Sequence, residues 1–373
     1  MQNFPEACTI ILRDLYVDDL MSGASSEDQA IDLQKGIVAV MKTGKFNIRK
    51  WSSNSNKVLE NIPIELRETQ HPLKLDPDET VKTLGLKWHP ALDSFSFSVQ
   101  PFSQEILTKR IILSDIAKLF DPLGLLAPVT ITAKLFMQQL WKVDLGWDQA
   151  LPLQLSESWL SFRNSLHKIQ SIQIPRYIGS CKARNFQLHG FSDASEKAIS
   201  AVVYLRTSSA AGNITCNLVA AKTKVAPLKQ VSLPRLELIG TVLLSKLVNT
   251  VKRALPITFD GIYGWTDSTV ALHWIKSSPQ RWKTFVANRV TEVQENLAPK
   301  YWFHISGLLN PADSASRGIL PEELINHQLW WHGPPLLLNC TWRASDIDLQ
   351  SEEAKKEERK VVLTHVALSQ DLL

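Results

Sequence analysis

Four carboxylates in the second half of the chain could support metal-dependent chemistry. They are Asp193 in Gly-Phe-Ser-Asp-Ala-Ser, Glu237 in Pro-Arg-Leu-Glu-Leu-Ile, Asp267 in Trp-Thr-Asp-Ser-Thr and Asp313 in Asn-Pro-Ala-Asp-Ser. Because like charges repel, acids that gather in one pocket need cations between them. Two divalent ions about 3.5–4 Å apart can clamp the attacking and leaving oxygens of a phosphodiester. If the fold brings the four acids together, this is the chemistry that they predict.

The elements expected around these acids alternate between strand and helix. Strands are predicted at 186–193, 198–206, 214–223, 262–266 and 301–306, with helices at 234–253 and 285–297. Asp193 and Asp267 each end an apolar strand, where sheets tend to place ligand sites. The order predicts an α/β fold with one mixed sheet and helical cover. Taken singly, each acid could equally be a cap, a turn former or a helix-face residue, so the argument depends on the set.

The first 180 residues show a different order of predicted elements. An apolar run at 10–17 predicts a strand that meets Asp18 and Asp19 at a tight turn, and Ser26 caps a helix that Gly44 ends. Further predictions are strands at 46–51, 81–89 and 95–99, helices at 108–120, 129–141 and 156–172, a loop at 54–77 and a linker at 175–184.

Composition limits the function classes only broadly. The chain has 373 residues, a formal charge of +4 and 44% hydrophobic residues, which allows two or three domains with real cores. The mild positive charge fits a polyanionic partner and a mixed surface equally well. The four cysteines are widely spaced and show no zinc signature. With no secretory signal and no apolar run that could span a bilayer, an intracellular, cytoplasmic location without membrane contact is expected.

Together the four acidic motifs resemble the ribonuclease H domain of long-terminal-repeat retrotransposons, particularly the Pao/BEL group. Asp-Ala-Ser, Leu-Glu-Leu, Thr-Asp-Ser and Asn-Pro-Ala-Asp-x-x-Ser-Arg-Gly carry the likeness, over about residues 185–320. The resemblance implies a ribonuclease-H-like fold in which Asp193, Glu237, Asp267 and Asp313 hold two Mg²⁺ (or Mn²⁺) ions and hydrolyse RNA in an RNA–DNA hybrid. The implied partners are the hybrid and other parts of the retroelement polyprotein.

Other polar residues near these motifs have two interpretations each. His304 could shuttle a proton or assist product release, although a half-buried strand histidine is the simpler interpretation. Lys222, Lys224, Arg281 and Lys283 could contact phosphates, or could be ordinary surface cations.

The Tyr-Val-Asp-Asp at 16–19 is similar to the polymerase motif of reverse transcriptases. Gly-Lys-Phe-Asn-Ile-Arg-Lys-Trp at 44–51 and Leu-Gly-Leu-Lys-Trp at 84–88 follow in the order of this group. The resemblance implies a partial polymerase site at Asp18 and Asp19, with Lys50 near the incoming nucleotide. Only 17 residues precede Asp18, so the third palm aspartate and the fingers are missing. We expect no reverse transcription from this chain alone.

Residues 106–147 resemble the connection region of Pao/BEL polyproteins, a stretch often labelled as an aspartic peptidase. That label is disfavoured, because the chain has no Asp-Ser-Gly or Asp-Thr-Gly motif. The predicted organisation is an α+β palm remnant with primer grip at 1–105, a helical thumb or connection at 106–180, the ribonuclease-H-like domain at 181–335 and a charged tail, without expected order, at 336–373. The alternative to an active ribonuclease is a catalytically inactive retroelement remnant that at most binds nucleic acid.

Overall fold

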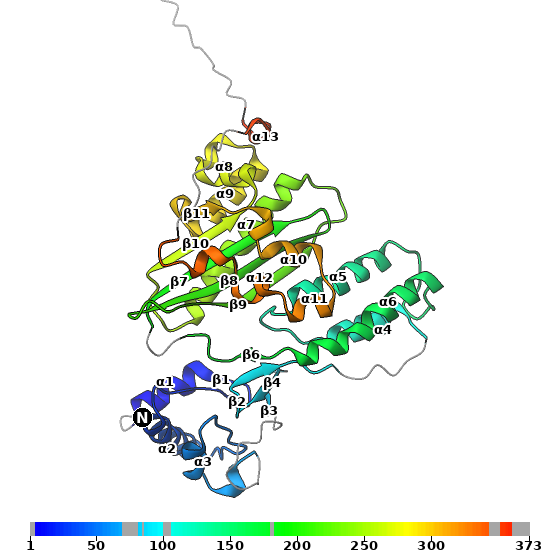
Figure 1. Cartoon of the computed structure of the whole chain (residues 1–373). Coiled ribbons are helices and arrows are strands. Elements are labelled where there is room, and N and C mark those ends of the chain that lie inside the picture. Colours follow the sequence, from blue (N-terminus) through cyan, green and yellow to red (C-terminus); the bar gives the residue numbers. More distant parts are fainter. Residues whose placement is uncertain are drawn as a thin grey trace, which may run out of the picture. The chain divides into compact units, whose positions relative to one another are not determined.

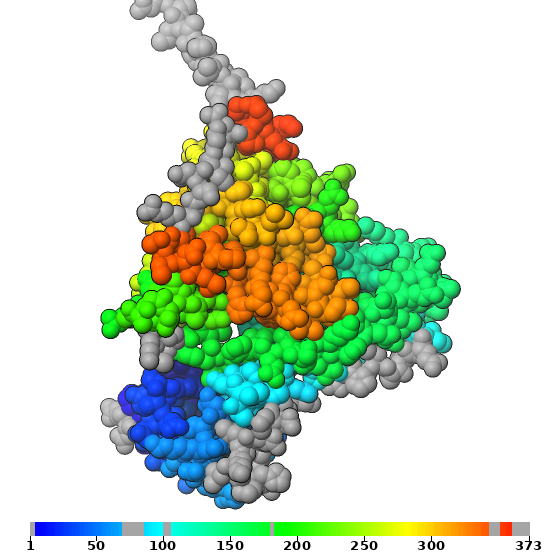
Figure 2. All heavy atoms as spheres, viewed as in Figure 1, coloured from blue at the N-terminus to red at the C-terminus, as the bar shows by residue number. Residues whose placement is uncertain are grey.

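A computed structural model describes residues 4–68, 81–83, 86–99, 106–179, 183–342 and 351–359 (Figures 1 and 2). The chain divides into two compact units. Unit 1 consists of Met1–Arg184, Ser209–Ala211 and Ile319–His327, and unit 2 consists of Asn185–Ser208, Gly212–Gly318 and Gln328–Leu373. Among the described residues, no helix combines the length and the apolar character needed to cross a membrane. The α/β fold class predicted from the sequence is confirmed, because each unit combines helices with a sheet.

Unit 1 begins with a helix where the sequence predicted a strand. Helix α1 spans Pro5–Asp14, and only the two-residue strand β1, Leu15–Tyr16, remains of the strand predicted at 10–17. Ala7 and Ile10 lie one turn apart and pack with Ile37 of helix α2, Glu27–Thr43, which stabilises the helical conformation. The cap predicted for α2 is confirmed, since the Ser26 hydroxyl accepts the Gln29 N–H at 3.3 Å.

The next part of unit 1 contains short elements. Strands β1 and β2, Asp19–Leu20, form the predicted hairpin. The strand predicted at 46–51 is wrong: only Trp51 forms a bridge, to Arg67. The segment predicted as a loop at 54–77 contains α3, Asn56–Glu60, and η1, Ile64–Leu66, while its residues 69–77 lie outside the described residues.

A four-stranded sheet in unit 1 has the order β3-β4-β5-β6. Its strands are Val81–Thr83, Leu86–His89, Ser94–Ser96 and Ile174–Pro175. The single strand predicted at 81–89 is therefore wrong, because β3 and β4 pair with each other antiparallel. Residues 84–85 of the predicted primer-grip motif lie outside the described residues. The linker predicted at 175–184 begins with Pro175 inside β6.

The helical part of unit 1 follows the prediction closely. Its helices are α4, Lys109–Ala117, α5, Ala127–Trp141, α6, Leu153–Ser165, η2, Leu166–Ser171, and α11, Pro321–Ile325. Two acids in the segment that resembles the connection region, Asp115 and Asp121, are engaged structurally. Asp115 pairs with Lys118 at 3.1 Å, and the Asp121 carboxylate accepts the backbone N–H groups of Leu125 and Leu126 at 2.8 and 2.9 Å.

Asp121 should make the stability of unit 1 depend on pH. Burial raises the pKa of Asp121 to about 6 from 3.8, against the opposing effect of the backbone N–H donors. Because the pKa is higher in the folded state, Asp121 stabilises the folded state fully below pH 3.8, and this stabilisation is lost as the pH rises through 6. We expect Asp121 to lower the free energy of unfolding by up to about 3 kcal/mol between pH 4 and pH 7.

Urea unfolding of unit 1 at a series of pH values measures this effect. The Asp121→Asn variant should show a flatter dependence over the same range, whereas Asp144→Asn, at an exposed acid in the same unit, should leave the wild-type slope intact. An equal slope in wild type and Asp121→Asn would contradict the assignment.

Unit 2 is built on a five-stranded sheet with the order β11-β10-β7-β8-β9. The strands are β7, Ala183–Ala194, β8, Ala198–Ser209, β9, Ile214–Val225, β10, Gly261–Thr266, and β11, Trp302–His304. Strands β8 and β9 pair antiparallel, whereas β10 runs parallel to both β7 and β11. All five strands were predicted from alternation and apolar runs, and the mixed sheet is confirmed.

Helices cover this sheet. The main ones are α7, Leu233–Ala254, α8, Thr269–Lys276, and α9, Thr284–Asn296 (Figure 1). Leu244 and Val248 of α7 lie against Gly190 of β7, and because side chains alternate along a strand, His189 and Phe191 face the other side. Helix α12, Gln328–His332, lies on that second side. The ring of Tyr204 contacts Phe191 there, and the Tyr204 hydroxyl donates to the Trp330 carbonyl at 2.7 Å.

The predicted disordered tail is wrong for the parts that the structure describes. Helix η6, Pro335–Leu338, is fixed by Arg206, whose Nε donates to the Leu337 carbonyl at 2.7 Å. Trp342 donates to the Gln187 side chain at 3.1 Å. A last short helix, α13, spans Glu352–Lys355 and buries Ala354 completely. Residues 343–350 and 360–373 lie outside the described residues.

Candidate active site

The parallel register of two strands brings the first two predicted acids together. Asp193 lies near the end of β7, and Asp267 follows β10 directly. Ser192 is the register partner of Thr266, so the next position along each strand places Asp193 opposite Asp267. The two carboxylates are close enough for the charge of Asp267 to raise the pKa of Asp193.

Helix α7 brings Glu237 to the same edge because a glycine lets the helix approach. A Cβ atom at Gly240 would lie 3.3 Å from the Asp193 carbonyl oxygen, so a larger residue would push the helix away from the end of β7. Glu237 lies one turn earlier and is half-buried. Ser268 lowers the pKa of its carboxylate, whereas the charges of Asp267 and Asp193 raise it.

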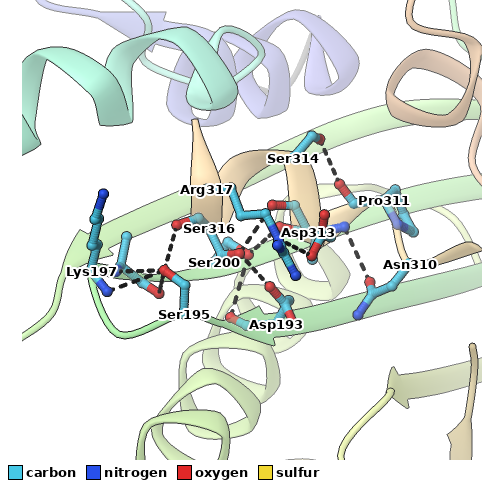
Figure 3. Close-up of polar contacts among 12 residues, drawn as sticks. Asp193, Ser195, Lys197, Ser200, Asn310, Pro311, Asp313, Ser314, Ser316 and Arg317 are labelled. Atoms are coloured by element: carbon cyan, nitrogen blue, oxygen red, sulfur yellow. Dashed lines mark hydrogen bonds and ion pairs between the residues drawn. The ribbon is translucent and has the colours of Figure 1, made fainter. Parts of the chain in front are cut away.

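The fourth acid is carried by a short helix that is tied to the sheet. Helix α10 spans Ala312–Arg317 and is preceded by η5, Gly307–Leu309. Figure 3 shows its polar contacts: Ser200 of β8 donates to the Ala312 carbonyl at 2.6 Å, and Ser195 donates to the Ser316 carbonyl at 2.8 Å. Asn310 donates to the Ser192 carbonyl at 3.0 Å and accepts the Ala312 N–H. These bonds hold Asp313 near the end of β7.

Two side chains of α10 contact the acids themselves (Figure 3). The Ser316 hydroxyl donates to Oδ2 of Asp193. The guanidinium of Arg317 pairs with Asp313 at 2.6 Å, although 72% of the Arg317 side chain is exposed. An exposed ion pair of this kind is weak and can exchange for another partner of Asp313.

Burial and mutual repulsion make these acids hard to ionise. Burial raises the pKa of Asp193 to about 6, and the charges of Asp267 and Asp313 add to the shift. Burial likewise raises the pKa of Glu237 to about 7, with smaller contributions from Asp267 and Asp193. The pKa of Asp267 is raised by burial as well. Such shifts mark sites where a cation or a proton must compensate the charge.

The donor set fits divalent cations that prefer oxygen ligands, since every acidic group at this edge is a carboxylate. Oδ1 of Asp267 is buried and has no hydrogen-bond partner, so one ligand oxygen already lacks compensation. In the described part of the chain, however, no three His, Cys, Asp or Glu side chains are arranged closely enough to form a ready ion site. The acids thus lie near one another without forming a ready cation site.

His304 lies on β11 beside these acids. Its Nε2 is 3.1 Å from the Asp267 carbonyl oxygen, so this nitrogen carries the proton that is donated. Burial lowers the pKa of His304, which disfavours the charged ring. The structure therefore shows the half-buried strand histidine that was the simpler of the two interpretations.

Several contacting residues were missed from the sequence. The Ser316 hydroxyl donates to Asp193, while Asn310 and Ser268 lower the pKa values of Asp267 and Glu237. Ser316 and Asn310 flank Asp313 in Asn-Pro-Ala-Asp-x-x-Ser, so their place in this motif was the available signal. Which carboxylate each one contacts depends on a strand far away in the sequence.

The predicted polymerase residues lie in unit 1. Asp18 and Asp19 are exposed, and the hairpin turn between β1 and β2 is formed by Val17 and Asp18, with Val17 at a φ of 56°. Lys50 is exposed and has a φ of 58°. A positive φ is costly for a β-branched residue such as valine. The predicted phosphate contacts differ among themselves: Lys222 and Lys224 lie on β9, whereas Arg281 and Lys283 lie beside α13.

Comparison with known proteins supports the retroelement resemblance. Residues 108–268 match the family model described as the Pao retrotransposon-like RNaseH-like domain. The match contains Asp193, Glu237 and Asp267 and ends before Asp313. No curated protein sequence matches the chain.

Two solved structures are similar at low sequence identity. Ribonuclease H1 from the halophilic archaeon Halobacterium salinarum NRC-1 is 16% identical over 38% of this chain and 98% of that one, with a TM-score of 0.24. A foamy viral protease-reverse transcriptase (dRH) in complex with double-stranded DNA is 11% identical over 61% of this chain, with a TM-score of 0.36. This chain spans 37% of the foamy viral chain.

Proposed function

We propose, from the premise that residues 108–268 carry a Pao retrotransposon-like RNaseH-like domain, that unit 2 hydrolyses the RNA strand of RNA–DNA hybrids with the help of divalent cations. The observation that carries the proposal is the convergence of four carboxylates at one sheet edge. Asp193 and Asp267 end neighbouring parallel strands, and Glu237 and Asp313 reach them from α7 and α10.

Asp193, Glu237, Asp267 and Asp313 would hold two Mg²⁺ or Mn²⁺ ions. When bound, such ions activate water for attack on a phosphodiester and stabilise the departing oxygen. The chain itself contributes orientation, since the Ser316 hydroxyl holds one oxygen of Asp193. The buried Oδ1 of Asp267, which lacks a hydrogen-bond partner, supports the assignment of this acid as a ligand.

The full chain incubated with a labelled RNA–DNA hybrid tests the proposal. We expect cleavage of the RNA strand with Mg²⁺ or Mn²⁺, no cleavage in EDTA, and no cleavage of double-stranded DNA. Products with 5′-phosphate and 3′-hydroxyl ends would support attack by water on the phosphorus with a departing 3′ oxygen.

Loss of the Ser316 hydroxyl should lower activity while leaving the fold intact. In Ser316→Ala the Asp193 carboxylate loses a hydrogen-bond donor, so its orientation is less well fixed and cleavage should fall about tenfold. Steady-state cleavage at several Mg²⁺ concentrations measures the change, and the half-saturating concentration should rise.

Ser314→Ala is the matched control for this variant. Ser314 lies in the same helix, but its hydroxyl donates to the Pro311 carbonyl at 3.0 Å and contacts no acid (Figure 3). Equal losses in the two variants would show that Ser316 acts only by stabilising α10.

The second candidate function is nucleic-acid binding without catalysis. The ion pair between Arg317 and Asp313 favours it, because it occupies an oxygen that a cation would need. Tight hybrid binding combined with no cleavage in either Mg²⁺ or Mn²⁺ would support this inactive remnant over the nuclease.

We also propose the division of the chain that was predicted from the sequence: a partial palm at 1–105, a connection region at 106–180, the ribonuclease-H-like domain at 181–335 and a tail at 336–373. Asp18 and Asp19, with Lys50, are assigned to the polymerase-derived part. Two neighbouring carboxylates in one exposed hairpin supply only one strand of a polymerase metal site, so no primer extension is expected from the chain alone. The aspartic peptidase label stays disfavoured, and an intracellular, cytoplasmic location stays a proposal, as do the polyprotein partners.

A further inference from the structure

A cationic surface in unit 2 is formed by residues of α7, of η3 (Pro279–Arg281) and of α9, together with Lys283 between η3 and α9. It consists of Arg235 on α7, Arg281 at the end of η3, Lys283, and Arg289 on α9. The guanidinium groups of Arg235 and Arg289 both lie over the ring of Phe285, 4.7 and 3.5 Å from its centroid. Cations grouped around an aromatic ring are well suited to phosphates and bases.

The described end of the chain is seated on this surface. Residues 351–359, called the capping segment here, include α13, which lies beside α8 (Figure 1), and the segment bonds to residues 281–283. Oε1 of Glu357 accepts hydrogen bonds from both Nε and Nη2 of Arg235, at 2.8 and 2.7 Å. Glu358 pairs with Arg281 at 2.6 Å. Nζ of Lys283 donates to the Lys356 carbonyl at 2.7 Å.

The backbone of the capping segment adds strand-like bonds. The Lys283 N–H donates to the Glu357 carbonyl at 2.8 Å, the Arg359 N–H donates to the Arg281 carbonyl at 2.9 Å, and Trp282 forms an antiparallel bridge with Glu358. Two glutamates on an extended backbone thus occupy two guanidinium groups, and guanidinium groups also bind phosphate oxygens.

The same surface lies next to the gathered carboxylates. Glu353 of the capping segment is close enough to Glu237 for their charges to repel. The capping segment therefore carries negative charge to the place where a nucleic-acid backbone would enter the candidate site.

We propose that this surface binds the sugar-phosphate backbone of a nucleic-acid strand, and that the capping segment and the strand exclude each other there. The proposal rests on the proposed function in that nucleic acid is the ligand. It differs in its content, because it concerns binding and competition rather than hydrolysis. Each charge in the segment that contacts the surface lowers the apparent affinity for nucleic acid.

Two single-charge variants of the full chain test the competition. Glu357→Gln removes the partner of Arg235, whereas Glu352→Gln removes the same charge from a residue that pairs only within the segment, with Lys355, and whose side chain is 87% exposed. Fluorescence anisotropy with a labelled RNA–DNA hybrid, in Ca²⁺ to prevent cleavage, should show about three- to tenfold tighter binding for Glu357→Gln. The control should change less than twofold.

Amide hydrogen exchange on the wild-type chain gives an independent readout. Saturating hybrid should speed exchange at the amides of Lys283 and Arg359, whose partners lie across the interface. Equal affinities of the two variants, or unchanged protection of these amides in the complex, would overturn the proposal. A hybrid that displaces the segment but is not cleaved in Mg²⁺ would refute the nuclease assignment and leave this one standing.

Discussion

Replacing Asp267 by asparagine should abolish hybrid cleavage and at the same time stabilise unit 2. The charge of Asp267 is repelled by the charges of Asp193 and Asp313, and its buried Oδ1 has no hydrogen-bond partner. Asparagine keeps the shape but removes the charge that a cation needs, so cleavage should fall by at least about 10³-fold, or ~4 kcal/mol of transition-state stabilisation. Without metal, removal of a buried like charge should raise the free energy of unfolding by about 1 kcal/mol.

Two measurements check this opposite pair of effects. Cleavage of a labelled hybrid in Mg²⁺ gives the loss of activity, and urea unfolding in EDTA gives the gain in stability. Glu196→Gln is a suitable control, because Glu196 is an exposed acid in the turn directly after β7 and should affect neither quantity. Retained cleavage in Asp267→Asn would remove Asp267 from the site. Loss of cleavage with a loss of stability would indicate a structural role instead.

Introducing valine at Gly264 should destabilise unit 2 more than any other single change discussed above. A Cβ atom at this position would lie 2.8–3.0 Å from the ring of Trp302 on the neighbouring strand. Trp302 is fully buried, and its Nε1 donates to the Leu297 carbonyl at 3.2 Å, so the ring has little room to move. We expect a loss of about 3 kcal/mol, although valine favours strands over glycine.

Thermal unfolding followed by tryptophan fluorescence measures the loss. Gly23→Val serves as the control, since nothing lies within 4 Å of a Cβ atom there. A melting temperature close to that of the wild type for Gly264→Val would mean that β10 and β11 can separate to admit the side chain. The parallel pairing Gly264–Trp302 would then be looser than the structure shows.

The sheet of unit 2 was predictable because its signals are local. Alternating apolar runs bounded by turn residues gave all five strands, and the position of Asp193 and Asp267 at strand ends followed from the same pattern. The strand order, with β10 beside β7, was not local information. It depends on pairing between distant segments, such as that of Ser192 with Thr266, which a pattern of hydrophobicity does not contain.

The failures have identifiable physical causes. Residues 10–17 contain the β-prone run Ile-Ile-Leu, but packing of Ala7 and Ile10 on Ile37 selects a helix. Residues 351–360 were interpreted as a solvated charge run. The residues that compensate their charges, Arg235 and Arg281, are more than 70 residues away and are not visible in the local sequence. Tertiary contacts of this kind override local preference.

The division into units has a practical meaning for protein dissection. Residues 319–327 belong to unit 1, although the segments before and after them, which end at Gly318 and begin at Gln328, belong to unit 2. Cutting the backbone once, near residue 184, would therefore not yield two self-sufficient fragments. The C-terminal product would carry a nine-residue stretch whose packing partners, η2 and α5, remain on the N-terminal one. Co-purification of the two fragments after limited proteolysis is the consequence to look for.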